Sequence, residues 1–215
     1  MFYLVKTPWL LRKLYPSCTW QIPTREKNVY LTFDDGPHPD ITPCVLDTLN
    51  QYQAKATFFC IGKNVVAHPD IYRRLLDEGH RTGNHTFNHL NGWKVQNDAY
   101  VNNIIEASKY IDSNLFRPPY GRITKFQVKI LSDIAAYKGS DRKFSIIMWD
   151  VLSGDFDTKL SAENCTLNVI RKTKPGSIVV FHDSEKAFPN LKYSLPLALK
   201  KLSDDGYTFK RIEGL

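Results

Sequence analysis

The chain has 215 residues, of which 42% are hydrophobic and 24% are charged. This length and composition are typical of a folded protein with one substantial core, and they exclude a disordered or low-complexity chain. The net charge of +7 comes from 29 Lys and Arg against 22 Asp and Glu. The basic residues are scattered rather than gathered into a run. The sequence therefore predicts a single domain over residues 1–215 that has no nucleic-acid partner.

Residues 1–27 precede the first predicted strand and begin with an apolar stretch. Lys6 and Pro8 interrupt this stretch, no small-residue cleavage site follows, and no segment reaches the roughly 18 apolar residues of a membrane span. The four cysteines are widely spaced, which favours free thiols in a reducing compartment. We therefore expect a cytoplasmic monomer whose residues 1–27 form an amphipathic collar on the domain, and weak contact with a membrane surface stays open.

Taken in chain order, predicted strands alternate with predicted helices. The strands are residues 28–33, 56–61, 81–84, 144–149 and 177–181, and the helices lie near 42–52, 68–79, 97–113, 124–136, 163–172 and 193–203. The most apolar strands do not alternate, as is typical of parallel strands that are covered on both faces. The pattern predicts an α/β fold of about six or seven strand–helix units, with a parallel sheet that is open or closed into a barrel.

Polar side chains follow several of these strands at the point where each strand ends. Asp34 and Asp35 come at the end of the first strand, and Gly36-Pro37 stops it. Two adjacent carboxylates repel each other unless a cation or a shared proton balances them, although two turn-forming aspartates are the simpler reading. The other such residues are His85, His89, Arg117, Asp150 and His182. Active sites of parallel sheets form at this edge, so one fold would gather these residues into one cleft.

His85 and His89 are four residues apart, and alone they fit a polar loop as well as a metal site. Two imidazoles with one carboxylate, however, form a catalytic site for zinc or a similar divalent ion, which activates water and polarises a carbonyl. A second aspartate is then free to act as a base on that water. His182 is the candidate that protonates the leaving atom, unless it is a core histidine bound to a backbone carbonyl.

Four segments of the chain, in this order, resemble the motifs of a known family. They are residues 32–37 (TFDDGP), 85–89 (HTFNH), 117–121 (RPPYG) and 178–182 (IVVFH). They are similar to four of the five motifs of the polysaccharide deacetylases, the chitooligosaccharide and peptidoglycan deacetylases of the fourth carbohydrate esterase family. The resemblance covers roughly residues 28–202. It implies a distorted, incomplete (β/α) barrel with about seven parallel strands.

The resemblance also implies an activity, the metal-dependent removal of N-acetyl groups from an N-acetylglucosamine-type oligosaccharide or glycoconjugate. It assigns one divalent metal ion to Asp35, His85 and His89, and this ligand set suits zinc, with cobalt or nickel as alternatives. It makes Asp34 the general base and His182 the general acid. Arg117 would orient Asp34 and hold it ionised. The substrate-binding residues would be Pro118, Tyr120, Gly121 and Phe156, with the backbone N–H of Tyr120 directed at the developing oxyanion.

The chain departs from the family's pattern in the fourth motif. Leu152 stands where the family has its first aspartate, while Asp155 and Phe156 match the later positions, with Phe156 in place of tryptophan. In the family the missing aspartate pairs with the motif's arginine. Asp150 lies two residues earlier, on the same side of an extended strand. We therefore expect Asp150 to pair with Arg117, and Asp150→Asn to cost more activity than Asp155→Asn.

Two other functions stay open. The same site chemistry would serve an ester-linked acetyl group, or another small acyl group on a sugar. The leucine at position 152 also leaves open a carbohydrate-binding protein with impaired turnover. The presence of both aspartates and of His85, His89 and His182 argues against this last reading, because binding alone needs neither a base nor an acid.

Overall fold

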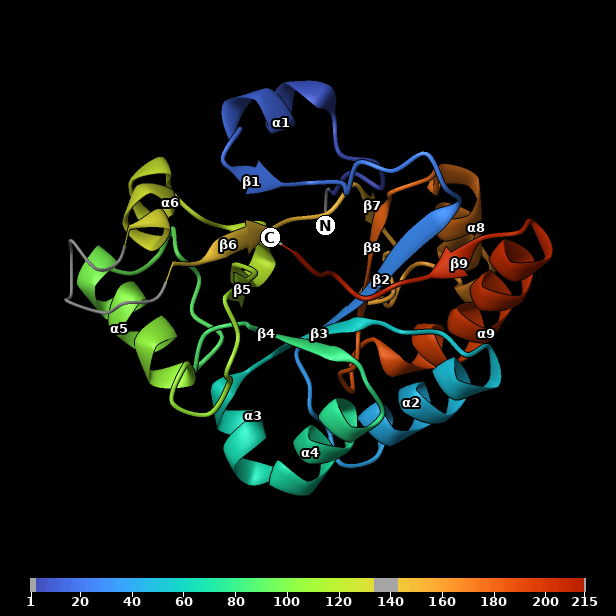
Figure 1. Cartoon of the computed structure of the whole chain (residues 1–215), viewed down its shortest axis with the longest axis horizontal. Helices are drawn as coiled ribbons and strands as arrows, with labels where there is room; N and C mark the ends of the chain where they lie inside the picture. The colour runs from blue at the N-terminus through green and yellow to red at the C-terminus, as the bar shows by residue number, and fades with distance from the viewer. Residues whose placement is uncertain (1–2, 134–142, 215) are drawn as a thin grey trace.

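The computed structural model describes residues 3–133 and 143–214, which form a ring of strands surrounded by helices (Figure 1). One sheet of nine strands runs in the order β1-β6-β5-β4-β3-β2-β8-β7, with β9 paired to β2, and every pairing between these strands is parallel. The strands are β1 (Cys18–Thr19), β2 (Asn28–Asp34), β3 (Thr57–Cys60), β4 (Arg81–Asn84), β5 (Leu115–Phe116), β6 (Ser145–Ile147), β7 (Val151–Leu152), β8 (Ile178–His182) and β9 (Thr208–Phe209). The predicted α/β barrel is confirmed. It has more strands than the seven expected because β1 and β7 have only two residues each, too few to show a pattern in the sequence.

Helices cover the outside of this ring. They are α1 (Trp9–Leu14), α2 (Ile41–Gln51), α3 (Gly62–Ala67), α4 (Pro69–Asp77), α5 (Asn97–Ala107), the 3₁₀ turn η1 (Pro119–Gly121), α6 (Lys125–Ser132), α8 (Ala162–Lys172) and α9 (Phe188–Asp204). Helix α5 ends six residues earlier than the predicted 97–113. Residues 134–136 of the predicted helix 124–136 lie outside the described residues. Within the described chain, no helix combines the length and the hydropathy that crossing a bilayer requires.

The alternation of side chains along β2 decides what the ring encloses. Val29, Leu31 and Phe33 point outward into the core formed with α2, α8 and α9, where the Phe33 ring lies 4.9 Å from that of Phe58. The residues between them point into the ring, because successive side chains of a strand face opposite sides. Thr32 and Asp34 are therefore interior residues. The parallel register of β2 with β8 sets Asp34 directly opposite His182 at the C-terminal edge.

The N-terminal segment contributes to both edges of the sheet. Residues 3–7 run along β7 in the antiparallel direction, with Leu152 donating to the carbonyl of Val5 (2.8 Å) and Thr7 donating to that of Asp150 (3.0 Å). Strand β1 then pairs with β6 at the other end of the sheet. Helix α1 lies between these two edge segments, outside the ring and apart from the other helices (Figure 1).

Candidate active site

Three potential metal ligands meet at the C-terminal edge of the ring. One ligand atom from each of Asp35, His85 and His89 lies within 4.8 Å of the others. Oδ1 of Asp35 is 3.2 Å from Nε2 of His89 and 3.8 Å from Nε2 of His85. This oxygen is buried and has no hydrogen-bond partner among the described residues. A buried, unsatisfied carboxylate oxygen beside two imidazole nitrogens fits a divalent cation, which is the chemistry that the sequence predicts for these residues.

The protonation of these ligands also suits a cation. Nδ1 of His85 lies 2.7 Å from the carbonyl oxygen of Arg117, so Nδ1 carries the proton and Nε2 is left free. Burial lowers the pKa of His85 to about 4, and the imidazole is neutral at pH 7. Burial alone would raise the pKa of Asp35, but the neighbouring histidines His89, His182 and His85 outweigh it and hold this pKa well below its usual range.

The backbone at the site is strained. Of the five described residues other than glycine that have positive φ, four belong to the site: Asp35 (88°), Thr86 (65°), His89 (56°) and Tyr120 (59°). Such conformations cost on the order of 1 kcal/mol or more each and persist where the surrounding structure fixes them. Here the Asp35 carbonyl accepts a hydrogen bond from the side chain of Asn64 (2.7 Å), and Asn84 accepts one from the Thr86 N–H (2.8 Å).

Asp34 is buried beside the metal ligands and pairs with Arg117. Nη1 of Arg117 donates to Oδ1 of Asp34 (2.7 Å) and to the Thr32 hydroxyl (2.6 Å). Nε and Nη2 of the same guanidinium donate to the carbonyls of Ile147 (3.1 Å) and Met148 (3.0 Å). Arg117 is fully buried. Burial lowers its pKa, and the Asp34 charge opposes this change. The predicted pairing of Asp34 with Arg117 is present in the structure.

The predicted pairing of Asp150 with Arg117 is wrong. Oδ2 of Asp150 instead accepts hydrogen bonds from Nζ of Lys6 (2.5 Å) and from the Ser177 hydroxyl (2.9 Å). The chain bends at Asp150, between β6 and β7, so it is not the extended strand that the prediction assumed. The bend turns the side chain toward the N-terminal segment, while the backbone carbonyls of Ile147 and Met148 reach the arginine. Asp150 therefore anchors residues 3–7 and has no contact with the active site.

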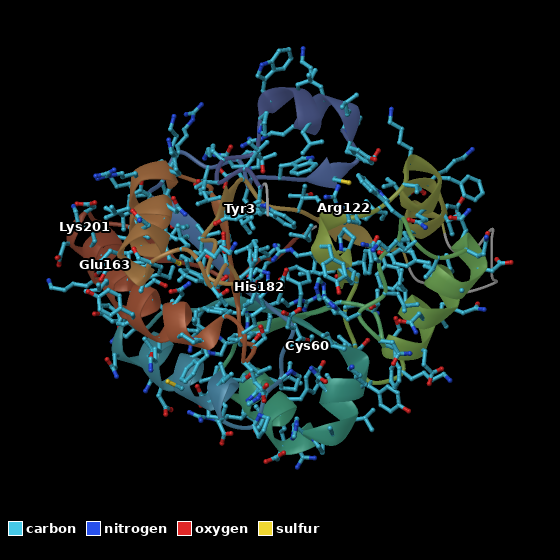
Figure 2. All side chains as sticks on the ribbon, turned by 180° about the vertical axis from the view of Figure 1, so that it is seen from behind. Tyr3, Cys60, Arg122, Glu163, His182 and Lys201 are labelled. Atoms are coloured by element: carbon cyan, nitrogen blue, oxygen red, sulfur yellow. The ribbon has the colours of Figure 1, made fainter. Side chains whose placement is uncertain are left out.

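His182 lies at the end of β8, near the middle of the ring (Figure 2). Asp155 accepts two hydrogen bonds from it, one from Nδ1 (2.8 Å) and one from the backbone N–H (2.7 Å), which leaves Nε2 free. Burial lowers the pKa of His182, but the charge and hydrogen bond of Asp155 outweigh burial and raise this pKa to about 9. His182 is thus a cation at pH 7 and able to donate a proton. Sequence analysis did not assign this role to Asp155, although its position in the fourth motif was the available signal.

Asp183, the residue after His182, supports the turn that carries Asp35. Its carboxyl group is buried and accepts hydrogen bonds from the Gly36 N–H (3.0 Å) and the Thr42 hydroxyl (2.6 Å). Burial raises the pKa of Asp183 to about 8. A Cβ atom on Gly36 would lie 2.0 Å from Oδ2 of Asp183, so only glycine fits at this position. Sequence analysis also missed Asp183.

Aromatic side chains form the rim of the site. Tyr120 is 57% exposed, and its ring centroid lies 4.6 Å from that of His89. Gly121, with φ of 64°, lies against the Trp149 ring, and Pro118 is buried beneath this turn. On the other side, the Phe156 ring lies 5.2 Å from His182 and 5.2 Å from Tyr3, which sequence analysis did not single out. Binding of substrate by Pro118, Tyr120, Gly121 and Phe156 stays a prediction, and the structure places Tyr120 against His89 and Phe156 against His182.

The arrangement combines a candidate metal site, a carboxylate held by an arginine and a protonated histidine at one edge of a (β/α) barrel. These are the parts that a metal-assisted hydrolase needs to cleave an acyl group from nitrogen or oxygen.

Comparison with known proteins gives the same class. Residues 21–137 match the family model "Polysaccharide deacetylase". A peptidoglycan-N-acetylglucosamine deacetylase of Bacillus cereus is 34% identical over 96% of this chain and 97% of its own length. A chitooligosaccharide deacetylase of Azorhizobium caulinodans is 31% identical over 76% of this chain and 77% of its own. The crystal structure of the Bc1960 peptidoglycan N-acetylglucosamine deacetylase with 4-naphthalen-1-yl-N-oxidanyl-benzamide superposes with a TM-score of 0.83, at 33% identity, over 96% of this chain and 95% of that one.

The chain belongs to the polysaccharide deacetylase family. It is a carbohydrate deacetylase, a hydrolase, and the family resemblance found in its sequence is confirmed.

Proposed function

We propose that the protein removes N-acetyl groups from N-acetylglucosamine-containing saccharides with the help of one zinc ion. The observation that carries this proposal is that two side chains at adjacent strand ends are each paired with a partner of opposite charge. Asp34 is paired with the Arg117 cation, and His182 is paired with the Asp155 anion. The first pair provides a proton acceptor and the second a proton donor, at the strand edge that also carries Asp35, His85 and His89. The names of the relatives supply the substrate class.

Asp35, His85 and His89 would hold the metal ion, because two imidazoles and one carboxylate suit zinc. The ion supplies Lewis acidity, which polarises the acetyl carbonyl and makes a bound water easier to deprotonate. The other steps belong to the chain. Asp34 accepts a proton from the attacking water, and the oxygen of this water bonds to the carbonyl carbon. The backbone N–H of Tyr120 is proposed to donate to the oxyanion. His182 then protonates the sugar nitrogen, the C–N bond breaks, and acetate and the free amine leave.

The test is release of acetate from chitooligosaccharides by metal-stripped protein, with and without added zinc or cobalt. We expect release that depends on the metal and that Asp34→Asn abolishes, because the asparagine cannot accept the water proton. Asp47→Asn, which changes an exposed carboxylate on α2, is the matched control. Binding of one zinc ion per chain without release would contradict the proposed substrate. Failure to bind zinc would contradict the site itself.

A further inference from the structure

The structure points to a surface that lies outside the active site and has no part in the proposed reaction. Of the thirteen large hydrophobic side chains that are exposed in the described part of the chain, five gather in the eleven residues from 4 to 14: Leu4, Trp9, Leu10, Leu11 and Leu14. Trp9 is 65% exposed and Leu10 is 57% exposed, and helix α1 buries none of its residues. The family's reaction does not account for this surface, which we call the α1 face. Exposed apolar side chains in this density mark interaction sites.

The α1 face is held in place by its flanks although its own side chains are uncovered. Before the helix, Thr7 donates through its hydroxyl to the Trp149 carbonyl (2.8 Å) and through its N–H to that of Asp150 (3.0 Å). After the helix, the Tyr15 carbonyl accepts hydrogen bonds from the Trp20 indole (3.1 Å) and from the Cys18 N–H (3.2 Å). A six-residue helix is not stable alone. Here both ends are fixed to the barrel, so binding at this face would order little additional chain.

The charged side chains in this part of the chain are all basic. No acidic residue precedes Glu26, whereas Lys6, Arg12, Lys13 and Arg25 are basic. Asp150 neutralises Lys6 and lies 3.8 Å from Arg12. Nζ of Lys13 lies 4.5 Å from the Trp9 ring centroid, at the boundary between the apolar and the charged side chains. Figure 1 shows α1 at the outside of the ring, on its own, where a flat surface would meet it without touching the other helices.

We propose that the α1 face docks on an anionic phospholipid bilayer. The apolar side chains would enter the boundary between headgroups and acyl chains, and Lys13 would face the phosphate groups. A tryptophan beside leucines and basic residues is the composition that favours this interface. A second copy of the chain is a poorer occupant, because it would bring the same positive charge to the face. The protein as a whole also carries +7.

The experiment is flotation of the full chain with vesicles of phosphatidylglycerol and phosphatidylcholine, compared with vesicles of phosphatidylcholine alone. We expect partition into the anionic vesicles that weakens as salt is raised. The variant W9S/L10S should partition at least about tenfold less, and Lys13→Gln about fivefold less. Leu197→Ser, which removes an exposed leucine of α9, should partition like the wild type. Quenching of tryptophan fluorescence by brominated acyl chains should disappear in Trp9→Phe.

Two outcomes would overturn the proposal. One is the absence of partition into anionic vesicles at low salt, or partition that W9S/L10S leaves unchanged. The other is a dimer in sedimentation equilibrium that W9S/L10S abolishes, since a second copy would then cover the face. The α1 variants lie outside the catalytic residues, so zinc-dependent release of acetate in solution should be equal in all of them. Failure of the proposed reaction would therefore leave the vesicle result standing, and failure of docking would leave the reaction standing.

Discussion

Replacing Asp155 with asparagine is expected to move the alkaline limit of activity to lower pH. His182 must be protonated to act as the acid, so its contribution is present below its pKa and is lost as the pH rises through it. Burial lowers the pKa of His182, and Asp155 outweighs burial and raises it from 6.5 to about 9. Asparagine can accept the hydrogen bond from Nδ1 but carries no charge. The charges of Asp35 and Asp34 still oppose burial in the variant, so we expect the pKa of His182 to fall back to about its ordinary value of 6.5.

The size of the effect follows from the fraction of His182 that is protonated. At pH 8, a group with a pKa of about 9 is roughly 90% protonated, and one with a pKa of about 6.5 is roughly 3% protonated. The change should lower kcat/KM at pH 8 by about 30-fold. At pH 6 the protonated fractions differ by less than about twofold, so the variant should recover most of its activity there.

The assay is kcat/KM for release of acetate from a chitooligosaccharide between pH 5 and 10, with zinc-loaded protein. Asp150→Asn is the matched control, because it removes an equally buried carboxylate that contacts Lys6 and Ser177 rather than the site. Its pH profile should keep the alkaline limit of the wild type. A loss in Asp155→Asn that is the same at every pH would refute the reasoning, since Asp155 would then position the imidazole without setting its charge.

Three further predictions concern stability and metal binding. Asp150→Asn should lower the free energy of unfolding in urea by about 1–3 kcal/mol, because the buried carboxylate holds Lys6 and Ser177; an unchanged value would mean that backbone bonds alone hold residues 3–7. Gly36→Ala should weaken zinc binding at least about tenfold in calorimetry, since its Cβ would clash with Asp183; wild-type affinity would show that the turn yields without cost. Burial lowers the pKa of His80 and of His85 to about 4, so these histidines are neutral in the metal-free protein above pH 6.5 and cost no stability there. As the pH falls toward 4, the free energy of unfolding should decrease by up to about 3 kcal/mol per histidine. His80→Gln should remove part of this loss, and a free energy of urea unfolding that does not change with pH would contradict the prediction.

The sequence predicted those parts of the site that single strand ends carry. Asp34, His85 and His182 each follow a recognisable strand or motif, and parallel strands bring their ends to one edge. The fold and a metal site at this edge could therefore be expected before the structure was seen. The assignment of Asp35 as a ligand and the pairing of Asp34 with Arg117 were expected from the family resemblance.

The segment between β6 and β7 was beyond prediction for a physical reason. The side chains at 150 and 152 would lie on one face and that at 155 on the other if the strand continued, but the chain bends at Asp150 and resumes as the two-residue β7. The position of a bend depends on tertiary contacts, here with Lys6 and Ser177, which are far away in the sequence. Asp150 therefore faces Lys6 and Ser177, while Asp155, three residues after β7, bonds to His182.

The leucine at position 152 therefore does not indicate an impaired enzyme. Leu152 is buried, and its N–H donates to the Val5 carbonyl. Arg117 needs no second carboxylate, because one hydroxyl and two carbonyls bind it besides Asp34, so that each of its three nitrogens has an acceptor. With Asp34 paired to Arg117 and His182 held as a cation by Asp155, the site keeps the two groups to which the proposed mechanism assigns the roles of base and acid.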